Sequence, residues 1–133
     1  MTPRTRAMVA AAAFVVLTSK KVAGVFDHSA GKKLRIAAER RGDQVQAFDA
    51  ENQAHFGGTL PELYDAGTKA HVAFHVDIRA PGETLTGHDR HSASDFTARV
   101  EEDCVQVYDY ADKAWFAYDI QDPNAAKSFH RAG

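Results

Sequence analysis

An aspartate that follows an aromatic residue or a histidine recurs along this chain and constrains its fold more than any other feature. The five pairs are Phe26-Asp27, Phe48-Asp49, Tyr64-Asp65, His88-Asp89 and Tyr108-Asp109. Successive aspartates are separated by 22, 16, 24 and 20 residues. A spacing of this length indicates repeated supersecondary units, each too small to bury an apolar face alone.

Further columns of similar residues emerge when the five aspartates are superposed. Large apolar residues stand seven positions after each aspartate: Leu34, Phe56, Val72, Phe96 and Phe116. The positions two before, four before and eleven after are also mostly apolar, whereas the positions three before and eight after are mostly polar or small. This alternation on both sides of the aspartate is typical of antiparallel strands with one buried face.

Each aspartate begins a four-residue connection between two such strands. The connections are residues 28–31, 50–53, 66–69, 90–93 and 110–113. An aspartate at the start of a hairpin turn accepts hydrogen bonds from the backbone N–H groups just ahead, so we expect the five aspartates to form turns rather than to catalyse. The sequence therefore predicts an all-β fold, a meander of about ten antiparallel strands in five hairpins. Because twisted sheets of this size rarely stay open, we expect a closed barrel, with a two-sheet sandwich as the alternative.

Residues 1–21 precede the repeats and differ from them in composition. Two arginines are followed by the unbroken apolar run 7–17 and by Thr18-Ser19. A short helix that packs its Ala-rich surface against the domain is the favoured interpretation, which goes with a cytoplasmic protein. The alternative is a secretory signal in residues 1–19, although no Ala-x-Ala cleavage site is present and Lys20-Lys21 would hinder export. Eleven apolar residues are too few to span a bilayer, which needs about 20.

The remaining chain divides at the end of the last repeat. Residues 22–120 are expected to form a single five-hairpin domain, and residues 121–133, which include Pro123 and Asn124, a flexible tail.

The tandem aromatic-Asp hairpins resemble the YD repeats of large bacterial surface and toxin proteins, and also small bacterial proteins made of five Tyr-Asp-Tyr-like hairpins. The resemblance covers residues 22–120. YD repeats usually place a glycine two or three positions after the aspartate; here Gly67 fits that pattern, Gly31 is displaced, and three units lack the glycine. The resemblance implies an architecture of hairpins and assigns no activity to any residue.

Charge and cysteine content exclude several classes of protein. The 133 residues carry a formal charge of −2, so the chain offers no general attraction for nucleic acid or for an anionic membrane. Cys104 is the only cysteine, which excludes an internal disulfide and a cysteine-rich zinc site. Its acidic neighbours also disfavour a reactive thiolate. No cofactor is expected, and the oligomeric state is left open.

The hairpin register places the residue before each aspartate opposite the residue six after it, on the outer face. The predicted pairs are Phe26 with Lys33, Phe48 with His55, Tyr64 with His71, His88 with Asp95, and Tyr108 with Trp115. Directly opposed side chains on a sheet lie close enough to touch. We therefore predict a rim of aromatic and histidine side chains, with these candidate binding residues: His55, Tyr64, His71, His88, Tyr108 and Trp115.

Three functions are compatible with this rim. The first is a binding or interaction module whose rings and histidines recognise a protein or a glycan. The second is a purely structural protein in which the pairs only stabilise hairpins. The third, which we favour least, is a metal-dependent enzyme. His71 and His75 are four residues apart on a strand and thus too distant to share an ion, which leaves only a cross-strand set such as His88, His91 and Asp95. No motif for nucleophilic catalysis or phosphate binding is present.

Overall fold

A computed structural model describes residues 1–77, 79, 80 and 82–121 of the chain. The predicted tail falls outside these residues apart from Gln121. The described part contains one helix and ten strands. They are α1 (Pro3–Thr18), β1 (Val22–Asp27), β2 (Lys32–Arg41), β3 (Gln44–Asp49), β4 (Ala54–Thr59), β5 (Glu62–Asp65), β6 (Ala70–His75), β7 (Thr84–Asp89), β8 (Ser94–Glu101), β9 (Cys104–Asp109) and β10 (Ala114–Ile120).

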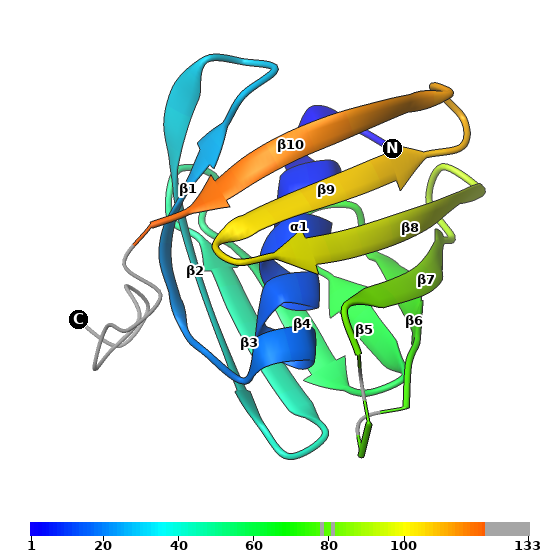
Figure 1. The fold of residues 1–133 in the computed structure, drawn as a ribbon. Coiled ribbons are helices and arrows are strands. Elements are labelled where there is room, and N and C mark those ends of the chain that lie inside the picture. The colour runs from blue at the N-terminus through cyan, green and yellow to red at the C-terminus, as the bar shows by residue number, and fades with distance from the viewer. Residues whose placement is uncertain (78, 81, 122–133) are drawn as a thin grey trace.

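The ten strands form a closed antiparallel barrel (Figure 1). Each strand pairs with its neighbours in sequence, and β1 closes the barrel by pairing with β10. The all-β meander of ten strands is therefore confirmed, and the barrel is the form that it takes. Closure gives every strand a partner on both sides and removes the exposed edges that an open sheet would have.

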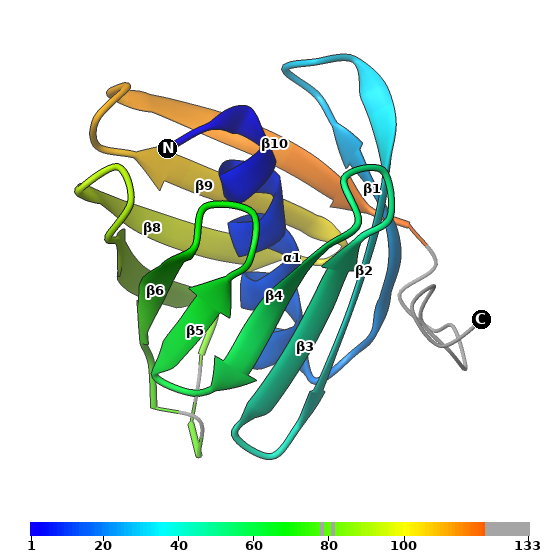
Figure 2. The same cartoon turned by 180° about the vertical axis from the view of Figure 1, so that it is seen from behind.

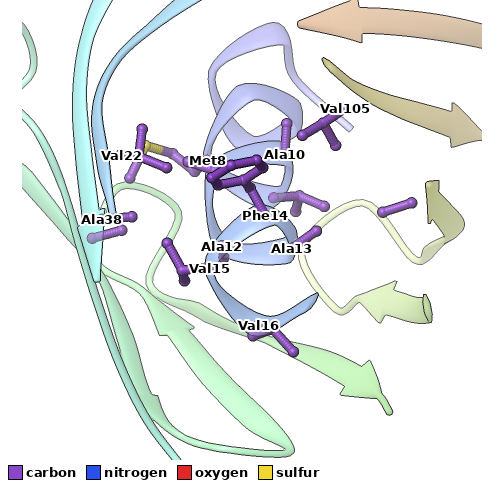
Figure 3. Close-up of a cluster of buried hydrophobic side chains, with 14 of the residues drawn as sticks. Met8, Ala10, Ala12, Ala13, Phe14, Val15, Val16, Val22, Ala38 and Val105 are labelled. Carbon is purple, nitrogen blue, oxygen red and sulfur yellow. The ribbon is translucent and has the colours of Figure 1, made fainter. Parts of the chain in front are cut away.

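The helix α1 lies inside the barrel (Figures 1 and 2). All of its residues from Thr5 to Leu17 are buried. Met8 points towards Val22 on one side of the helix, and Ala10 points towards Val105 on the other (Figure 3). A helix that is apolar on every face has to be enclosed on every face. The sequence predicted a helix docked through one surface, so its position in the core is a correction to that prediction.

Three phenylalanines fill the part of the interior that the helix leaves free. The helix packs mainly against β1–β3 and β8–β9. Phe56, Phe74 and Phe96 come from β4, β6 and β8 and stack edge to face, with ring centroids 6.3 and 5.5 Å apart. All three are buried, so helix and rings together make one continuous core.

The predicted alternation holds along most of the barrel, and its exceptions have a cause in the strand register. Two residues of the apolar column, Leu34 and Phe116, are only half-buried. At three junctions between hairpins the column residue pairs with the next aspartate, as Phe56 does with Asp65. At the other two junctions the partner of the aspartate lies two residues further along. Leu34 and Phe116 consequently extend beyond the neighbouring hairpin and lack cover on one side.

Two further exceptions are a bulge in β1 and an exposed proline, and Leu60 and Val76, eleven positions after their aspartates, are also half-buried. Gly24 has φ of 125° and marks a register shift between Ala23 and Val25. A bulge of this kind reverses which residues face inward. Val22 is therefore buried, while Ala23, which the column predicted to be apolar core, is half-buried. Pro61, in the corresponding position of the third unit, is exposed.

No helix in the described ranges is long and apolar enough to cross a membrane.

Candidate functional site

The five repeat aspartates form a ring around the barrel end that holds the start of α1, and we call them the aspartate ring. Its members are Asp27, Asp49, Asp65, Asp89 and Asp109, and all five are buried. Each carboxylate accepts a hydrogen bond from the backbone N–H two residues ahead, at 2.9 to 3.2 Å. The predicted turn-forming role is thus observed in all five units.

The aspartate ring also holds cations from the start of the helix. Arg4 donates to Asp65, and Thr5 donates to the same carboxylate at 3.1 Å. Arg6 Nη1 lies 3.1 Å from Asp109 Oδ2 and 2.9 Å from Asp112 Oδ2. These contacts fix the depth of α1 in the barrel, a role for the aspartates that their sequence pattern did not indicate.

The pKa of Asp109 reflects this arrangement. Burial by itself raises the pKa of a carboxyl group because it disfavours the charged form. Hydrogen bonds and charge from the Met1 ammonium and from Arg6 outweigh burial and hold the pKa of Asp109 below its usual value. The Asp109 carboxylate is therefore ionised and structural at neutral pH.

The outer face carries the predicted rim, and the register of all five pairs agrees with the prediction. Phe26 faces Lys33, Phe48 faces His55, Tyr64 faces His71, His88 faces Asp95, and Tyr108 faces Trp115. Because the barrel is closed, these pairs point outward in different directions around it. The six candidate binding residues therefore divide among separate parts of the rim.

One part of the rim runs over β3–β6. His55 stacks against Phe48 with ring centroids 4.7 Å apart, and Tyr64 meets His71 edge to face at 5.2 Å. His55 and Tyr64 also border a hollow of about 280 Å³ beside Gly57, which has no side chain to fill it.

A second part contains His88, whose Nδ1 lies 2.7 Å from Asp95 Oδ1. His91, which the sequence suggested as a third ligand here, instead donates its backbone N–H to Asp89 in the turn. Within the described residues no three histidine, cysteine or acidic side chains are grouped closely enough to hold a metal ion.

The third part is the most exposed, and we call it the ring cluster: Tyr108, Tyr110 and Trp115. Tyr108 lies edge to face against both partners, with centroids 4.7 Å from Tyr110 and 5.2 Å from Trp115. Tyr110 is 52% exposed and Trp115 54% exposed. Tyr110 falls in a predicted turn and was not among the predicted binding residues. Its position two residues after Tyr108, in Tyr-Asp-Tyr, is the signal that could have found it.

The ring cluster adjoins a hollow of about 310 Å³ on β6–β8 that has both polar and apolar lining residues. Tyr110 lines this hollow, and its hydroxyl lies 3.2 Å from Thr97 Oγ1. His75, Thr86 and Asp95 contribute further polar groups. Tyr110 therefore joins an aromatic surface to a set of hydrogen-bonding side chains.

Cys104 is half-buried on β9. Burial, and after it the carboxylates of Asp119 and Glu101, raise the pKa of its thiol. A raised pKa lowers the fraction of reactive thiolate, so the structure gives this cysteine no nucleophilic character.

Comparison with family models finds no match, and comparisons with curated proteins and with solved structures find none either. The likeness to YD repeats stays a prediction.

Proposed function

We propose that this protein is a non-catalytic binding module that recognises a glycan through the ring cluster and the adjoining hollow. The main supporting observation is the pair of exposed rings Tyr110 and Trp115, which both contact the half-buried ring of Tyr108 between them. Tyr108 lies on β9, Trp115 on β10 and Tyr110 in the turn that joins these strands. Tyrosine and tryptophan dominate recognition surfaces because they bury a large area, lose little conformational entropy and keep a polar tip.

The polar side chains in the hollow favour a glycan over a purely apolar ligand. A sugar presents an apolar ring face together with several hydroxyl groups, and both need partners. The rings of Tyr110 and Trp115 supply the first, and the side chains of His75, Thr86 and Asp95 supply hydrogen-bonding groups in the hollow that Tyr110 lines. A site with aromatic walls and a few placed polar groups is the usual form of a small-ligand site.

Trp115 provides a direct test because it is the only tryptophan in the chain. Fluorescence titration of the folded protein with oligosaccharides selected on a glycan array should change the emission of Trp115. Tyr110→Ala should weaken binding of the selected oligosaccharide at least about tenfold, which is a typical loss for an aromatic anchor.

Tyr64→Ala is the matched control, since Tyr64 is also exposed but lies on β5. It should bind as the parent does. Equal loss in both variants would place the site elsewhere on the rim, and an array without any bound glycan would contradict the proposal.

The alternative is that the rim pairs serve only to stabilise their hairpins, by a few tenths to about 1 kcal/mol per pair. Thermal melts of the same two variants address it. If Tyr110→Ala loses stability while no oligosaccharide binds the parent, the structural role is the better explanation.

A further inference from the structure

A cavity of about 220 Å³ opens at the barrel end that holds the aspartate ring. It lies between the start of α1 and the β1–β2 hairpin, whose tip extends away from the helix (Figures 1 and 2). Its charged lining residues are Asp27, Asp49, Glu51, Arg4 and Lys32, and Ala7, Leu34 and Ile36 form apolar walls. The cavity lies at the junction where Asp49 pairs with Ile36, two residues after Leu34, so that Leu34 extends beyond the neighbouring hairpin.

The same two-residue offset occurs once more in the barrel, where Asp27 pairs with Tyr118, two residues after Phe116. At that junction the space that corresponds to the cavity is filled. In the fifth hairpin Phe116 extends beyond its neighbour, and the Arg6 guanidinium lies over its ring, with Cζ 3.5 Å from the ring centroid. The same guanidinium binds Asp109 and Asp112. Asp109 of the aspartate ring, Asp112 of the turn and the phenyl ring of Phe116 thus enclose the Arg6 guanidinium.

Superposition of the two hairpins by their repeat positions relates the two spaces residue by residue. Asp109 corresponds to Asp27, which is the same position of the repeat. The turn residue three further on is Asp112 in the fifth unit and Ala30 in the first, and the column residue seven further on is Phe116 or Leu34. Asp27, Ala30 and Leu34 all line the cavity. The cavity is therefore the counterpart of the Arg6 site.

The cavity lining carries three carboxylates, Asp27, Asp49 and Glu51, against the two cations Arg4 and Lys32, which leaves an excess of one negative charge. Asp27 is buried, accepts bonds from Ser29 and Ala30 through Oδ1, and forms no ion pair with a described residue. Asp49 has Arg4 Nη1 only at 3.9 Å, since the other Arg4 nitrogen is bound to Asp65. A buried carboxylate is stabilised by a cation that hydrogen-bonds to it.

We propose that this cavity binds an alkylguanidinium, a guanidinium group on a short aliphatic chain, with Asp27 as its main anchor. The guanidinium takes the place that Arg6 takes beside Asp109, and the aliphatic chain lies against Ala7 and Ile36. The volume suits a ligand smaller than a typical drug-sized molecule. The cavity shares no lining residue with the hollow beside the ring cluster, so this proposal does not depend on the proposed glycan binding.

The test is a calorimetric titration with butylguanidinium, with butylurea as the neutral probe of the same shape. Butylguanidinium should bind with a dissociation constant of about 1 mM or tighter, and butylurea should bind at least about tenfold more weakly. Asp27→Asn keeps an oxygen for the turn but removes the charge, and should weaken butylguanidinium at least about tenfold.

Two control variants keep the test decisive. Asp89→Asn removes the charge of another buried member of the aspartate ring, one that does not line the cavity, and should leave the binding of butylguanidinium unchanged. Ala30→Asp restores the acid that the fifth hairpin has at this position, and should tighten binding several-fold. Equal binding of the two probes, or no gain in Ala30→Asp together with no loss in Asp27→Asn, would overturn the proposal.

Discussion

Individual turn residues show which parts of each hairpin are determined by the local sequence. The aspartate that begins each turn could be predicted because its carboxylate bonds to the N–H groups beside it. The last residue of each turn could not. It has φ between 50° and 66° in every unit, yet the residues there are Gly31, Gln53, Lys69, Ala93 and Lys113. Four of the five lack the glycine that this conformation favours, so the residue types at this position did not indicate it.

Tyr118 is a single residue whose chemistry depends on the whole interior. It is fully buried, and its hydroxyl makes no hydrogen bond of ordinary geometry with a described residue, although the Arg6 guanidinium lies close enough to lower its pKa in part. Burial, followed by the nearby Asp27 carboxylate, raises the pKa of Tyr118 to about 12 from a usual value of 10.0. The neutral phenol is therefore favoured in the folded state.

Tyr118→Phe should alter the alkaline limit of stability. A pKa raised in the folded state contributes nothing to unfolding below pH 10, and destabilises the fold progressively as pH rises from 10 to 12, by about 2–3 kcal/mol. Tyr118→Phe removes that loss and, since the hydroxyl makes no hydrogen bond of ordinary geometry with a described residue, should cost less than about 1 kcal/mol at pH 7. Denaturant melts at pH 7 and pH 11 compare the two proteins. A parallel loss of stability in both at pH 11 would show that another group titrates.

At the scale of strands, the apolar column residues differ in what surrounds them. Phe56→Ala should cost about 3–5 kcal/mol because Phe56 is fully buried and packs against the ring of Phe74. Phe116→Ala should cost clearly less, since the ring is half-buried and its cover is the Arg6 guanidinium. Gln46→Ala, on the exposed face of β3, should stay within about 0.5 kcal/mol. Urea unfolding ranks the three.

Equal losses for the two phenylalanines would contradict the register difference between their hairpins. The sequence could predict that both positions are apolar, because alternation is local. It could not predict that one is covered by a neighbouring strand and the other by Arg6, because strand register depends on the closure of the whole barrel.

The helix was predictable as an element and not as a core. Its cap is local: Thr2 accepts the N–H of Thr5, and Pro3 begins the first turn. Its all-round apolar run was the available sign of complete burial. The candidate site was likewise predictable only in part. The outward pairs follow from alternation, whereas the contact of Tyr110 with Tyr108 depends on the path of a turn.

At the scale of the whole molecule, the barrel complements both ends of the helix it encloses. The start of α1 faces the aspartate ring, and Arg40 on β2 donates to the carbonyl oxygen of Val16 at the other end, at 3.2 Å. Negative groups at a helix start and a cation at its end both interact favourably with the helix dipole. Barrel and helix are therefore matched in shape and in direction.

Removing residues 1–19 should accordingly abolish cooperative unfolding rather than merely lower the melting temperature. The enclosed helix supplies a large share of the single core, and its loss exposes the inner faces of β1–β3 and β8–β9. The cost should exceed about 5 kcal/mol, comparable with the whole stability of a small domain. Circular dichroism melts and binding of a hydrophobic dye measure both effects. Two point variants give the matched comparison: Ala12→Asp, inside the barrel, should behave like the truncation, and Lys20→Asp, exposed just beyond the helix, should melt as the parent does. A truncated chain that still melts cooperatively would show that the barrel folds without its helix, and would revive the interpretation of residues 1–19 as a removable export signal.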